Sequence, residues 1–399
     1  MSVLAVVALF VSPVFAQCPP LNTAQEVLDC ALAIDPAVKL AAARQAQAGA
    51  GARSASQRPN PDLETKGTWG GGASQLELDL VQTVEAGGKR QARVARSRAG
   101  EDEASAELSG AQADTALKTV SALYRLRQLQ SELDLTEEAL RTYSRISVQL
   151  RSRPRLAPEQ EVSRSIFELA EADFGLRKAS LDAEQTGLVK ALETSLGVPL
   201  STTTLALPAS RLDWPSIPEA SSLDGSETRH AQASLKLAQA ERDGARAASW
   251  PDFRLGPSFQ HQSGEGQSQR MFGLNLGVGL PLYHRNSAGR EQARLGEEAA
   301  MVGAETVRLR LRSERERERA RYEKAVAALR ALGGRKALRD KHEQVEDFFE
   351  RGLISSSLVI EAHRQMLDFT RSRHEHELAA VTALWRIRAI DGTILGEKL

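Results

Sequence analysis

Few side chains in this sequence could bind a metal ion or catalyse a reaction, and they are widely spaced. The chain has 399 residues, with seven histidines and two cysteines. His374 and His376 are two positions apart in a segment predicted to be helical, and residues at that spacing do not face each other. They cannot easily share a metal ion. The sequence therefore predicts a solvent-exposed histidine pair and no metal site.

Patterns that mark a catalytic centre are also missing from the sequence. It contains no glycine-rich phosphate-binding loop, no His-Glu-x-x-His run and no Cys-x-x-Cys pair. His261 and His284 flank a predicted hairpin, but no residue nearby completes a coordination set. Aspartate and glutamate pairs are frequent because the predicted helix faces are charged, so they do not indicate an acid–base pair. We expect no catalytic residue and no cofactor, and hence a protein that is not an enzyme.

Charge and composition exclude two further classes. Lys and Arg together number 52, as do Asp and Glu, whereas a nucleic-acid binder would usually carry a basic surplus. After the N-terminus, no stretch offers the about 20 consecutive apolar residues of a membrane-spanning helix. Aromatic residues make up 5% of the chain, and Ala, Leu, Glu, Gln and Arg are frequent. This composition favours long exposed helices over one compact core.

The N-terminus has the pattern of an export signal. Residues 3–14 are almost entirely apolar and a small-residue cleavage site ends at Ala16, so segment 1–16 is predicted to be a removed signal peptide. No Lys or Arg precedes the apolar run, which leaves open whether the chain starts upstream. Three states of Cys18 also stay open. It could be lipidated, as in bacterial lipoproteins cut directly before a cysteine, disulfide-bonded to Cys30, as an exported compartment permits, or free.

The remainder of the chain contains an internal duplication. Four short segments recur in the same order: 52–56 as 245–249, 61–63 as 251–253, 91–94 as 292–295, and a glycine-closed helix end at 196–197 as at 391–392. The separation of about 190–200 residues is far longer than the period of a solenoid, so it indicates duplication of a whole unit. We predict a first repeat over 17–197, an irregular proline-rich connector over 198–226 and a second repeat over 227–399.

Each repeat is predicted to alternate long helices with a β-hairpin, in the order helix, hairpin, long helix, return helix. The last three elements cover 63–85, 89–152 and 158–196 in the first repeat, and 253–283, 290–351 and 355–390 in the second. The first helix of the chain is predicted to run from Thr23 to Gln57, where a proline-rich segment ends it.

Side-chain patterns also predict which helix faces are buried. On the first return helix, Val162, Ile166 and Leu169 mark the apolar side. In the second long helix, the run from Arg312 to Arg319 alternates basic and acidic residues. Such a run is typical of a solvated helix face supported by ion pairs between neighbouring turns.

The hairpins alternate apolar and polar residues over about ten positions, which is typical of membrane-spanning strands. In the first hairpin, the leucines from Leu76 to Leu80 alternate with Glu77 and Asp79. In the second, Asn275 stands between leucines in the same way. Glu77, Asp79 and Asn275 are therefore predicted to face a barrel lumen, while the leucines face lipid. Half-buried hairpins of a soluble sheet are the alternative.

Strands can cross a bilayer only in a closed barrel, because lipid offers no partner for free backbone groups. Four strands per chain cannot close a barrel, so the chain must oligomerise. A dimer would supply eight strands, whose interior is filled by side chains, whereas a trimer would supply twelve and could leave an opening. The predicted fold is therefore mainly α with β, and the predicted function is a passage.

Features spread over the chain resemble the TolC family of outer-membrane efflux factors, across essentially the whole mature chain. They are the duplication, Arg58-Pro59-Asn60-Pro61 after the first helix, Glu85-Ala86-Gly87-Gly88-Lys89-Arg90 after the first hairpin, and Leu280-Pro281-Leu282-Tyr283-His284-Arg285-Asn286 at the exit of the second. The Glu-x-Gly-Gly-Lys-Arg segment looks particularly like the heavy-metal, CzcC-type branch. The resemblance implies a homotrimer in the outer membrane of a Gram-negative bacterium. Four transmembrane β-strands and long coiled-coil helices per protomer would form a 12-stranded β-barrel continuous with a 12-helix periplasmic α-barrel.

The resemblance also implies partners, namely a periplasmic adaptor (membrane fusion) protein and an inner-membrane RND-type pump. The chain would then be the outer-membrane channel of a tripartite efflux pump. By position, the tips that close the tube and contact the adaptor are Arg155, Leu156, Ala157, Arg351, Gly352, Leu353, Ile354 and Ser355. TolC-like second tips often carry two acidic residues at the narrowest opening. Here Glu361 stands at the second of these positions and Leu358 at the first, which implies one carboxylate ring that would favour cations.

Two other functions stay open from the sequence. A secreted coiled-coil scaffold would have the same helices with short soluble sheets. A TolC-like duct for protein secretion would share the fold and differ in its partners. The preference for heavy-metal cations as cargo depends on the branch resemblance.

Overall fold

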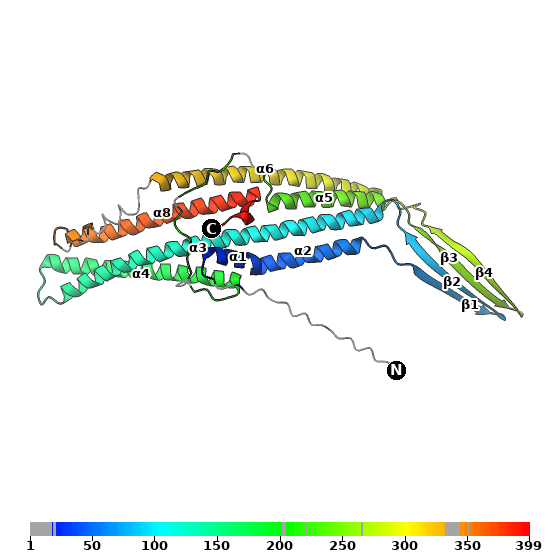
Figure 1. Cartoon of the computed structure of the whole chain (residues 1–399), viewed down its shortest axis with the longest axis horizontal. Coiled ribbons are helices and arrows are strands. Elements are labelled where there is room, and N and C mark those ends of the chain that lie inside the picture. Colours follow the sequence, from blue (N-terminus) through cyan, green and yellow to red (C-terminus); the bar gives the residue numbers. More distant parts are fainter. Residues whose placement is uncertain are drawn as a thin grey trace, which may run out of the picture.

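The computed structural model describes residues 18, 21–201, 205–211, 213–219, 222–264, 266–331, 344–345, 347–349 and 351–399. The predicted signal segment 1–16 lies outside these residues, as does the stretch 332–343 of the predicted second long helix. The described part is a long helical body with a β-sheet projecting from one end, and the C-terminus lies near the middle of the body (Figure 1).

The helical body is built around α3 (Lys89–Arg151), which runs along almost its entire length (Figure 1). With 63 residues, this helix is about 95 Å long. On one side of α3, α2 (Pro36–Ala55) and α4 (Pro158–Leu196) follow one another. On another side, α5 (Ser226–Ala247) and α8 (Ser356–Asp391) do the same.

The outermost helix is α6 (Ser287–Ala331), which packs against α5 and α8. The body is therefore a row of helices that begins with α2 and α4 and ends with α6. Apart from the short α1 (Ala24–Ile34), no helix of the described chain lies beyond either end of this row. Among the described helices, none combines the length and the apolar composition needed to cross a membrane.

The predicted single helix from Thr23 to Gln57 is wrong in its middle, because the chain forms α1 and α2 with a break at Asp35. The Asp35 carboxylate accepts a hydrogen bond from the backbone N–H of Ala37 at 2.8 Å, and Pro36 takes the first position of α2. Proline has no N–H to donate within a helix but suits its first turn. The Asp-Pro pair therefore ends one helix and starts the next.

Cys18 forms a disulfide with Cys30 of α1, with the two Cα atoms 5.6 Å apart. Of the three states that the sequence leaves open for Cys18, the structure contains the disulfide. The sulfur of Cys18 is then bonded to protein and cannot carry a lipid thioether.

The buried face of α4 differs from the predicted one. Phe167 and Phe174 are buried, where their rings meet Tyr143 of α3. Val162 and Leu169 are exposed, and Ile166 only borders the buried cluster. The helix carries two apolar stripes, and the chain buries the aromatic one because Tyr143 offers it a partner. The second stripe has no partner within the described chain.

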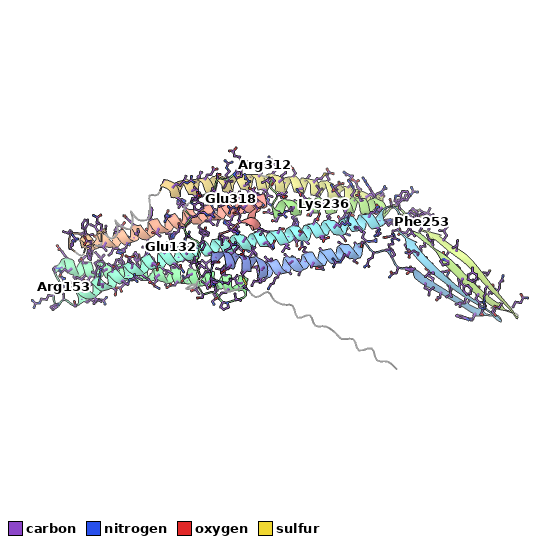
Figure 2. The ribbon with its side chains drawn as sticks, in the orientation of Figure 1. Glu132, Arg153, Lys236, Phe253, Arg312 and Glu318 are labelled. Atoms are coloured by element: carbon purple, nitrogen blue, oxygen red, sulfur yellow. A yellow bond between two sulfur atoms is a disulfide. The ribbon has the colours of Figure 1, made fainter. Side chains whose placement is uncertain are left out.

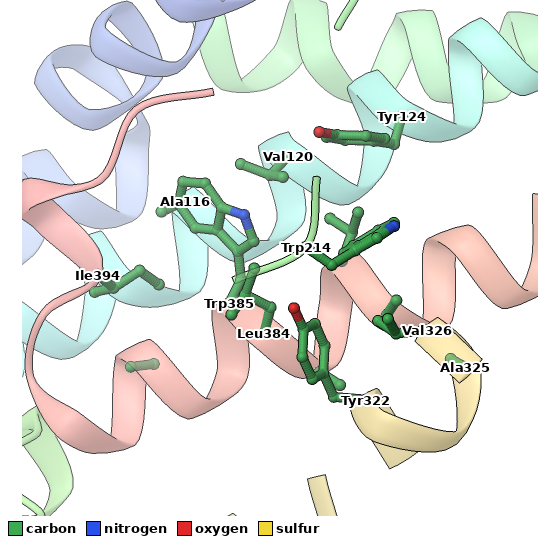
Figure 3. Packing of buried hydrophobic residues seen from close by; sticks show 14 of the residues in the cluster. Ala116, Val120, Tyr124, Trp214, Tyr322, Ala325, Val326, Leu384, Trp385 and Ile394 are labelled. Carbon is green, nitrogen blue, oxygen red and sulfur yellow. The ribbon is translucent and has the colours of Figure 1, made fainter. Parts of the chain in front are cut away.

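Figure 3 shows the largest cluster of buried apolar side chains among the described residues. It joins α3, α6 and α8 to the connector through Trp214, Tyr322 and Trp385. The Tyr322 hydroxyl donates to the Pro215 carbonyl oxygen at 2.6 Å, and its ring meets that of Trp214 edge-on. The connector is irregular but firmly held, because its tryptophan is part of the core.

The four strands form one antiparallel sheet in the order β1-β2-β3-β4. They are β1 (Asp62–Gly70), β2 (Ala73–Val84), β3 (Phe253–Gly264) and β4 (Gln267–Val278). Gly71 and Gly72 connect β1 to β2 with φ values of 59° and 82°. These left-handed values are those of a two-residue type I′ turn, which glycine adopts readily. The predicted hairpin 253–283 is too long, since β4 ends at Val278, shortly before Pro281, which cannot donate to a strand ladder.

The predicted solvated face between Arg312 and Arg319 is only partly correct. Arg312 is exposed, but Arg315 is buried and binds Asp391 at 2.8 Å. The Arg315 guanidinium also donates to the carbonyl oxygens of Pro218 and Glu219. Because Asp391 ends α8, this pair ties α6 to α8 and to the connector.

Candidate channel surfaces: sheet faces, helix–sheet joint and tips

The sheet has one apolar face, and its outer strand β4 is the most exposed part of it. On β4, Phe272, Leu274 and Leu276 are 83%, 87% and 76% exposed. Contiguous exposed apolar side chains of this size mark a surface for lipid or protein. Trp69 stands at the far end of the sheet, and the exposed Tyr283 lies just beyond its helix-side end. Aromatic residues at both ends of an apolar band are typical of transmembrane β-barrels.

The opposite face carries the predicted lumen residues Glu77, Asp79 and Asn275. Asp79 lies opposite Ser258 of β3, which lies opposite Gly273 of β4, two positions before Asn275. Directly opposed residues share a face of a sheet, as do residues two positions apart on a strand. The register therefore brings Glu77, Asp79 and Asn275 onto one face.

An ion pair that the sequence did not suggest crosses this polar face. Arg254 of β3 binds the carboxylate of Glu64 on β1, although β2 lies between them. On β2, Asp79 and Val81 are each 1% exposed. The pair thus covers the middle of β2. Sequence reasoning could not find it, because the two residues are 190 positions apart and meet only through the strand order.

The Glu-x-Gly-Gly-Lys-Arg segment lies at the joint between the sheet and the helices. The carboxylate of Glu85 binds the Arg93 guanidinium of α3 through both oxygens. These hydrogen bonds hold the pKa of Glu85 below its ordinary value. Arg93 also donates to the carbonyl oxygens of Ala55 and Gln57 at the end of α2, at 3.0 and 3.2 Å. Carbonyls at a helix end otherwise lack partners, so Arg93 holds β2, α3 and α2 together.

A second ion pair at the joint links the two repeats. Lys89 Nζ lies 2.7 Å from Oδ1 of Asp252, next to the start of β3 at Phe253 (Figure 2). Gly87 has φ +68°, and a Cβ atom there would lie 2.6 Å from the Trp250 side chain. Only glycine fits that position without strain. The segment that resembles the heavy-metal branch therefore has a structural role in this chain.

The predicted tip residues lie at the end of the body away from the sheet (Figure 1). Residues 155–157 connect α3 to α4, and residues 351–355 precede α8. The first turns of α4 and α8 that follow the tips are in contact, since the Ser356 hydroxyl lies 3.2 Å from that of Ser163. Glu361 is exposed and accepts a hydrogen bond from Gln365 of the next turn at 2.9 Å. Within one chain it is an ordinary surface carboxylate.

The prediction of an exposed histidine pair is wrong for His374, although His376 is exposed. His374 is 3% exposed, and its Nδ1 lies 2.8 Å from Oε1 of Glu132, which is fully buried in the half of α3 away from the sheet (Figure 2). Arg125 binds Glu132 at 2.8 Å and also Glu184 of α4 at 2.7 Å. Across the described residues, no group of three or more His, Cys, Asp or Glu side chains could hold a metal ion.

One turn further along α8, Glu377 joins three segments of the chain. Its carboxylate binds Arg127 of α3 and accepts a hydrogen bond from Ser210 of the connector at 2.9 Å. Gln128 donates to it at 3.2 Å. Burial opposes ionisation of Glu377, but Arg127 and the hydrogen bonds outweigh it, so its pKa lies below the ordinary value. Glu132, His374 and Glu377 thus form a buried polar cluster between α3 and α8.

A four-stranded sheet with an exposed apolar face, joined end-on to a rod of long helices, defines a class of outer-membrane channel subunits. The chain belongs to the outer membrane efflux protein family, whose model matches residues 27–154 and 227–393. The predicted TolC-like fold and the location in the outer membrane with a periplasmic extension are confirmed. As a member of this family the chain is an efflux channel subunit and not an enzyme.

Solved outer-membrane channels share this fold. The open state of MtrE from Neisseria gonorrhoeae is 17% identical, with 94% of this chain and 90% of that chain covered and a TM-score of 0.76. CmeC from Campylobacter jejuni is 16% identical, with 93% and 86% covered and a TM-score of 0.74. CusC is 16% identical, with 96% and 95% covered and a TM-score of 0.70. No curated protein matches the sequence.

Proposed function

We propose that three copies of the chain assemble into the outer-membrane duct of a tripartite efflux pump. The proposal depends above all on the sheet. Its outer strands β1 and β4 have no further strand beside them in the described chain, and its apolar face is exposed. In lipid, such edges must be closed by other strands. Three four-stranded sheets make a twelve-stranded barrel, which is wide enough to leave a lumen. Glu77 and Asn275 line that lumen, and Asp79 lies on the same face beneath the Arg254–Glu64 pair.

The helices close into a twelve-helix tube by the same symmetry. Exposed apolar residues recur every seven positions at both ends of the helix row: Val162, Leu169 and Leu176 on α4, and Leu295, Val302 and Leu309 on α6. A seven-residue spacing is that of helices packed in coiled coils. Contact between α6 of one copy and the α2–α4 end of the next is head-to-tail and closes into a ring.

The tips contact the pump partners. Residues 155–157 and 351–355 lie at the end of the body away from the sheet, where a periplasmic adaptor bound to an inner-membrane RND-type pump meets the duct. In a trimer, Glu361 near the second tip contributes three carboxylates. Such a ring at a constriction favours the passage of cations.

The cargo proposed here is a heavy-metal cation. Two observations support it: the resemblance of the segment 85–90 to the CzcC-type branch, and the carboxylates of Glu77 and Asp79 on the polar face of the sheet. In this proposal the cation passes through without a binding site of its own.

Two measurements test this function together. The mass of the detergent-purified protein should be that of a trimer, and a gene deletion should raise the cellular content of zinc, cadmium or cobalt ions until the gene is restored. A water-soluble monomer would overturn the duct and favour a secreted scaffold. A deletion strain could instead have a normal metal content and keep inside the cell the proteins that the wild type secretes. That result would show protein secretion in place of metal efflux.

A further inference from the structure

A cavity of about 360 Å³, here called the connector cavity, lies midway along the helical body, away from the sheet and the tips. Its walls come from the start of α1, from residues 206–211 of the connector, from Tyr124 of α3 and from Leu399. The connector is fixed at this place, because the Ala24 N–H donates to the Ala206 carbonyl oxygen at 3.1 Å. Cavities of this volume hold small molecules. The transport function proposed above does not use it.

Two side chains that line the connector cavity, those of Arg211 and Tyr124, offer donors that lack a partner within the described chain. The Arg211 guanidinium forms no ion pair or hydrogen bond with any residue that the structure describes, and neither does the Tyr124 hydroxyl. Burial raises the pKa of Tyr124, although Arg211 and Arg127 oppose this effect. The phenol is therefore protonated and able to donate. An arginine in this setting offers up to five N–H groups and no acceptor.

The nearest carboxylate cannot neutralise Arg211, because it is already occupied. Glu377 binds Arg127 and accepts from Ser210 and Gln128. From Arg211 only the backbone N–H reaches Glu377, at 3.3 Å. The half-buried guanidinium is thus not paired with Glu377.

A second arginine adds to the positive charge on this side of the body. Arg388 of α8 binds Glu397 at 3.1 Å, but its Nη1 is buried without a hydrogen-bond partner. Burial lowers the pKa of Arg388, and the like charge of Arg211 acts in the same direction against the opposite effect of Glu397. Arg388 does not line the connector cavity itself, but its charge and that of Arg211 repel each other.

We propose that the connector cavity binds a small anion through its phosphate or carboxylate group, with Arg211 and Tyr124 as the donors. A guanidinium binds both groups through paired N–H···O hydrogen bonds. The bound anion ties the connector to α1 and α3 and neutralises the cluster of Arg211 and Arg388. The site is independent of the cargo and of the pump partners, so its test does not depend on transport.

The test is isothermal titration calorimetry of the full-length protein in detergent, with inorganic phosphate and separately with acetate, at an ionic strength held constant with chloride. We expect saturable binding of at least one of the two. In Arg211→Gln the binding should weaken roughly tenfold or more, as expected for the loss of a charged hydrogen-bond donor. In Tyr124→Phe, which keeps the ring in its buried place, it should weaken several-fold.

The matched control is Arg141→Gln, because Arg141 is an exposed arginine of α3 that pairs only with Glu137 of its own helix. This variant should bind as the wild type does.

Soluble dihexanoyl-phosphatidylglycerol separates two sources of phosphate. Tighter binding than that of inorganic phosphate assigns the site to a lipid headgroup, and weaker binding assigns it to a free anion. Absence of saturable binding in the folded wild type, or equal binding by Arg211→Gln, would overturn the proposal.

Discussion

Nδ1 of His374 lies 2.8 Å from Oε1 of Glu132, a contact that joins α8 to α3 across 242 positions of the sequence. Both side chains are buried, and Arg125 binds the same carboxylate. Burying charges is costly, so such clusters often contribute more to specificity than to net stability. Around them α3 and α8 also meet through apolar and aromatic side chains, such as Tyr124 and Trp385. We therefore interpret the buried polar cluster as the element that fixes the register of the two helices.

Replacing Glu132 with Gln should lower the free energy of unfolding by about 3 kcal/mol, because Arg125 and His374 lose their shared negative charge in a buried place. Urea unfolding of the detergent-solubilised protein, followed by circular dichroism, measures this change. Arg141→Gln removes an exposed pair and should cost less than about 0.5 kcal/mol. Similar losses in the two variants would contradict a special role for Glu132.

Glu377 should make the helical body sensitive to acid. Its pKa lies below the value of 4.5 for a free carboxyl group, since Arg127 and the hydrogen bonds outweigh the effect of burial. The folded state then binds fewer protons than the unfolded state, so the stabilisation is complete above the ordinary pKa and is lost as the pH falls through the lowered value. We expect the melting temperature of the wild type to fall between about pH 5 and pH 3 more steeply than that of Glu377→Gln. Parallel pH profiles would exclude Glu377 as the cause.

Val302 of α6 should lie in the contact between subunits. Replacing it with Asp places a charge in an apolar seam, so the variant should run as a monomer in detergent at concentrations where the wild type is a trimer. Multi-angle light scattering measures the mass. Val302→Leu keeps the apolar contact and should remain trimeric. A trimeric aspartate variant would exclude this face of α6 from the interface.

Gly87 should be intolerant of a side chain. Its φ is +68°, and a Cβ atom would lie 2.6 Å from Trp250, so Gly87→Ala should destabilise the joint by about 1–3 kcal/mol. Gly100 lies inside α3, and a methyl group there would have no atom within 4 Å. Gly100→Ala should therefore be neutral or stabilise the helix by up to about 1 kcal/mol. Thermal unfolding of both variants checks the contrast, and a stable Gly87→Ala protein would refute the close approach.

Arg93 should hold the end of α2 in place. Arg93→Gln leaves the carbonyl groups of Ala55 and Gln57 without their donor, so amide hydrogen exchange over residues 53–57 should become faster. Arg96→Gln, which removes an exposed pair with Glu241, is the matched control. Mass spectrometry of the exchanged peptides measures the exchange rate in both variants. Unchanged exchange in Arg93→Gln would show that other contacts fix this helix end.

Elements with a local pattern can be predicted from the sequence. The alternation of polar and apolar residues around Glu77 and Asp79 predicts the strands and their polar face. Successive side chains of a strand point to opposite faces, so neighbouring residues alone reveal the pattern. The break at Asp35 is readable in principle, since an aspartate before a proline is a helix start. Apolar residues that continue on both sides of it conceal the break.

Contacts across the fold cannot be predicted in this way. The pairs Arg254–Glu64 and Glu132–His374 depend on which strands and helices become neighbours, and nothing near either residue in the sequence states this. The prediction for the face of α4 fails for another reason. Leu169 and Phe167 are both apolar, and the sequence does not say which of two apolar stripes faces its own chain and which faces a neighbour.

Because α3 is one continuous helix, it can carry a small rotation from one end of the molecule to the other. No proline interrupts the helix between Lys89 and Arg151, and proline is the commonest cause of a sharp bend. Over a shaft of about 95 Å, a rotation of about one degree at the membrane end displaces the far end by about 1.7 Å. The Glu85–Arg93 pair lies close to the membrane end of α3, about which the helix would rotate. Changes there that are too small to alter the fold would be magnified at the tips, at the other end of α3.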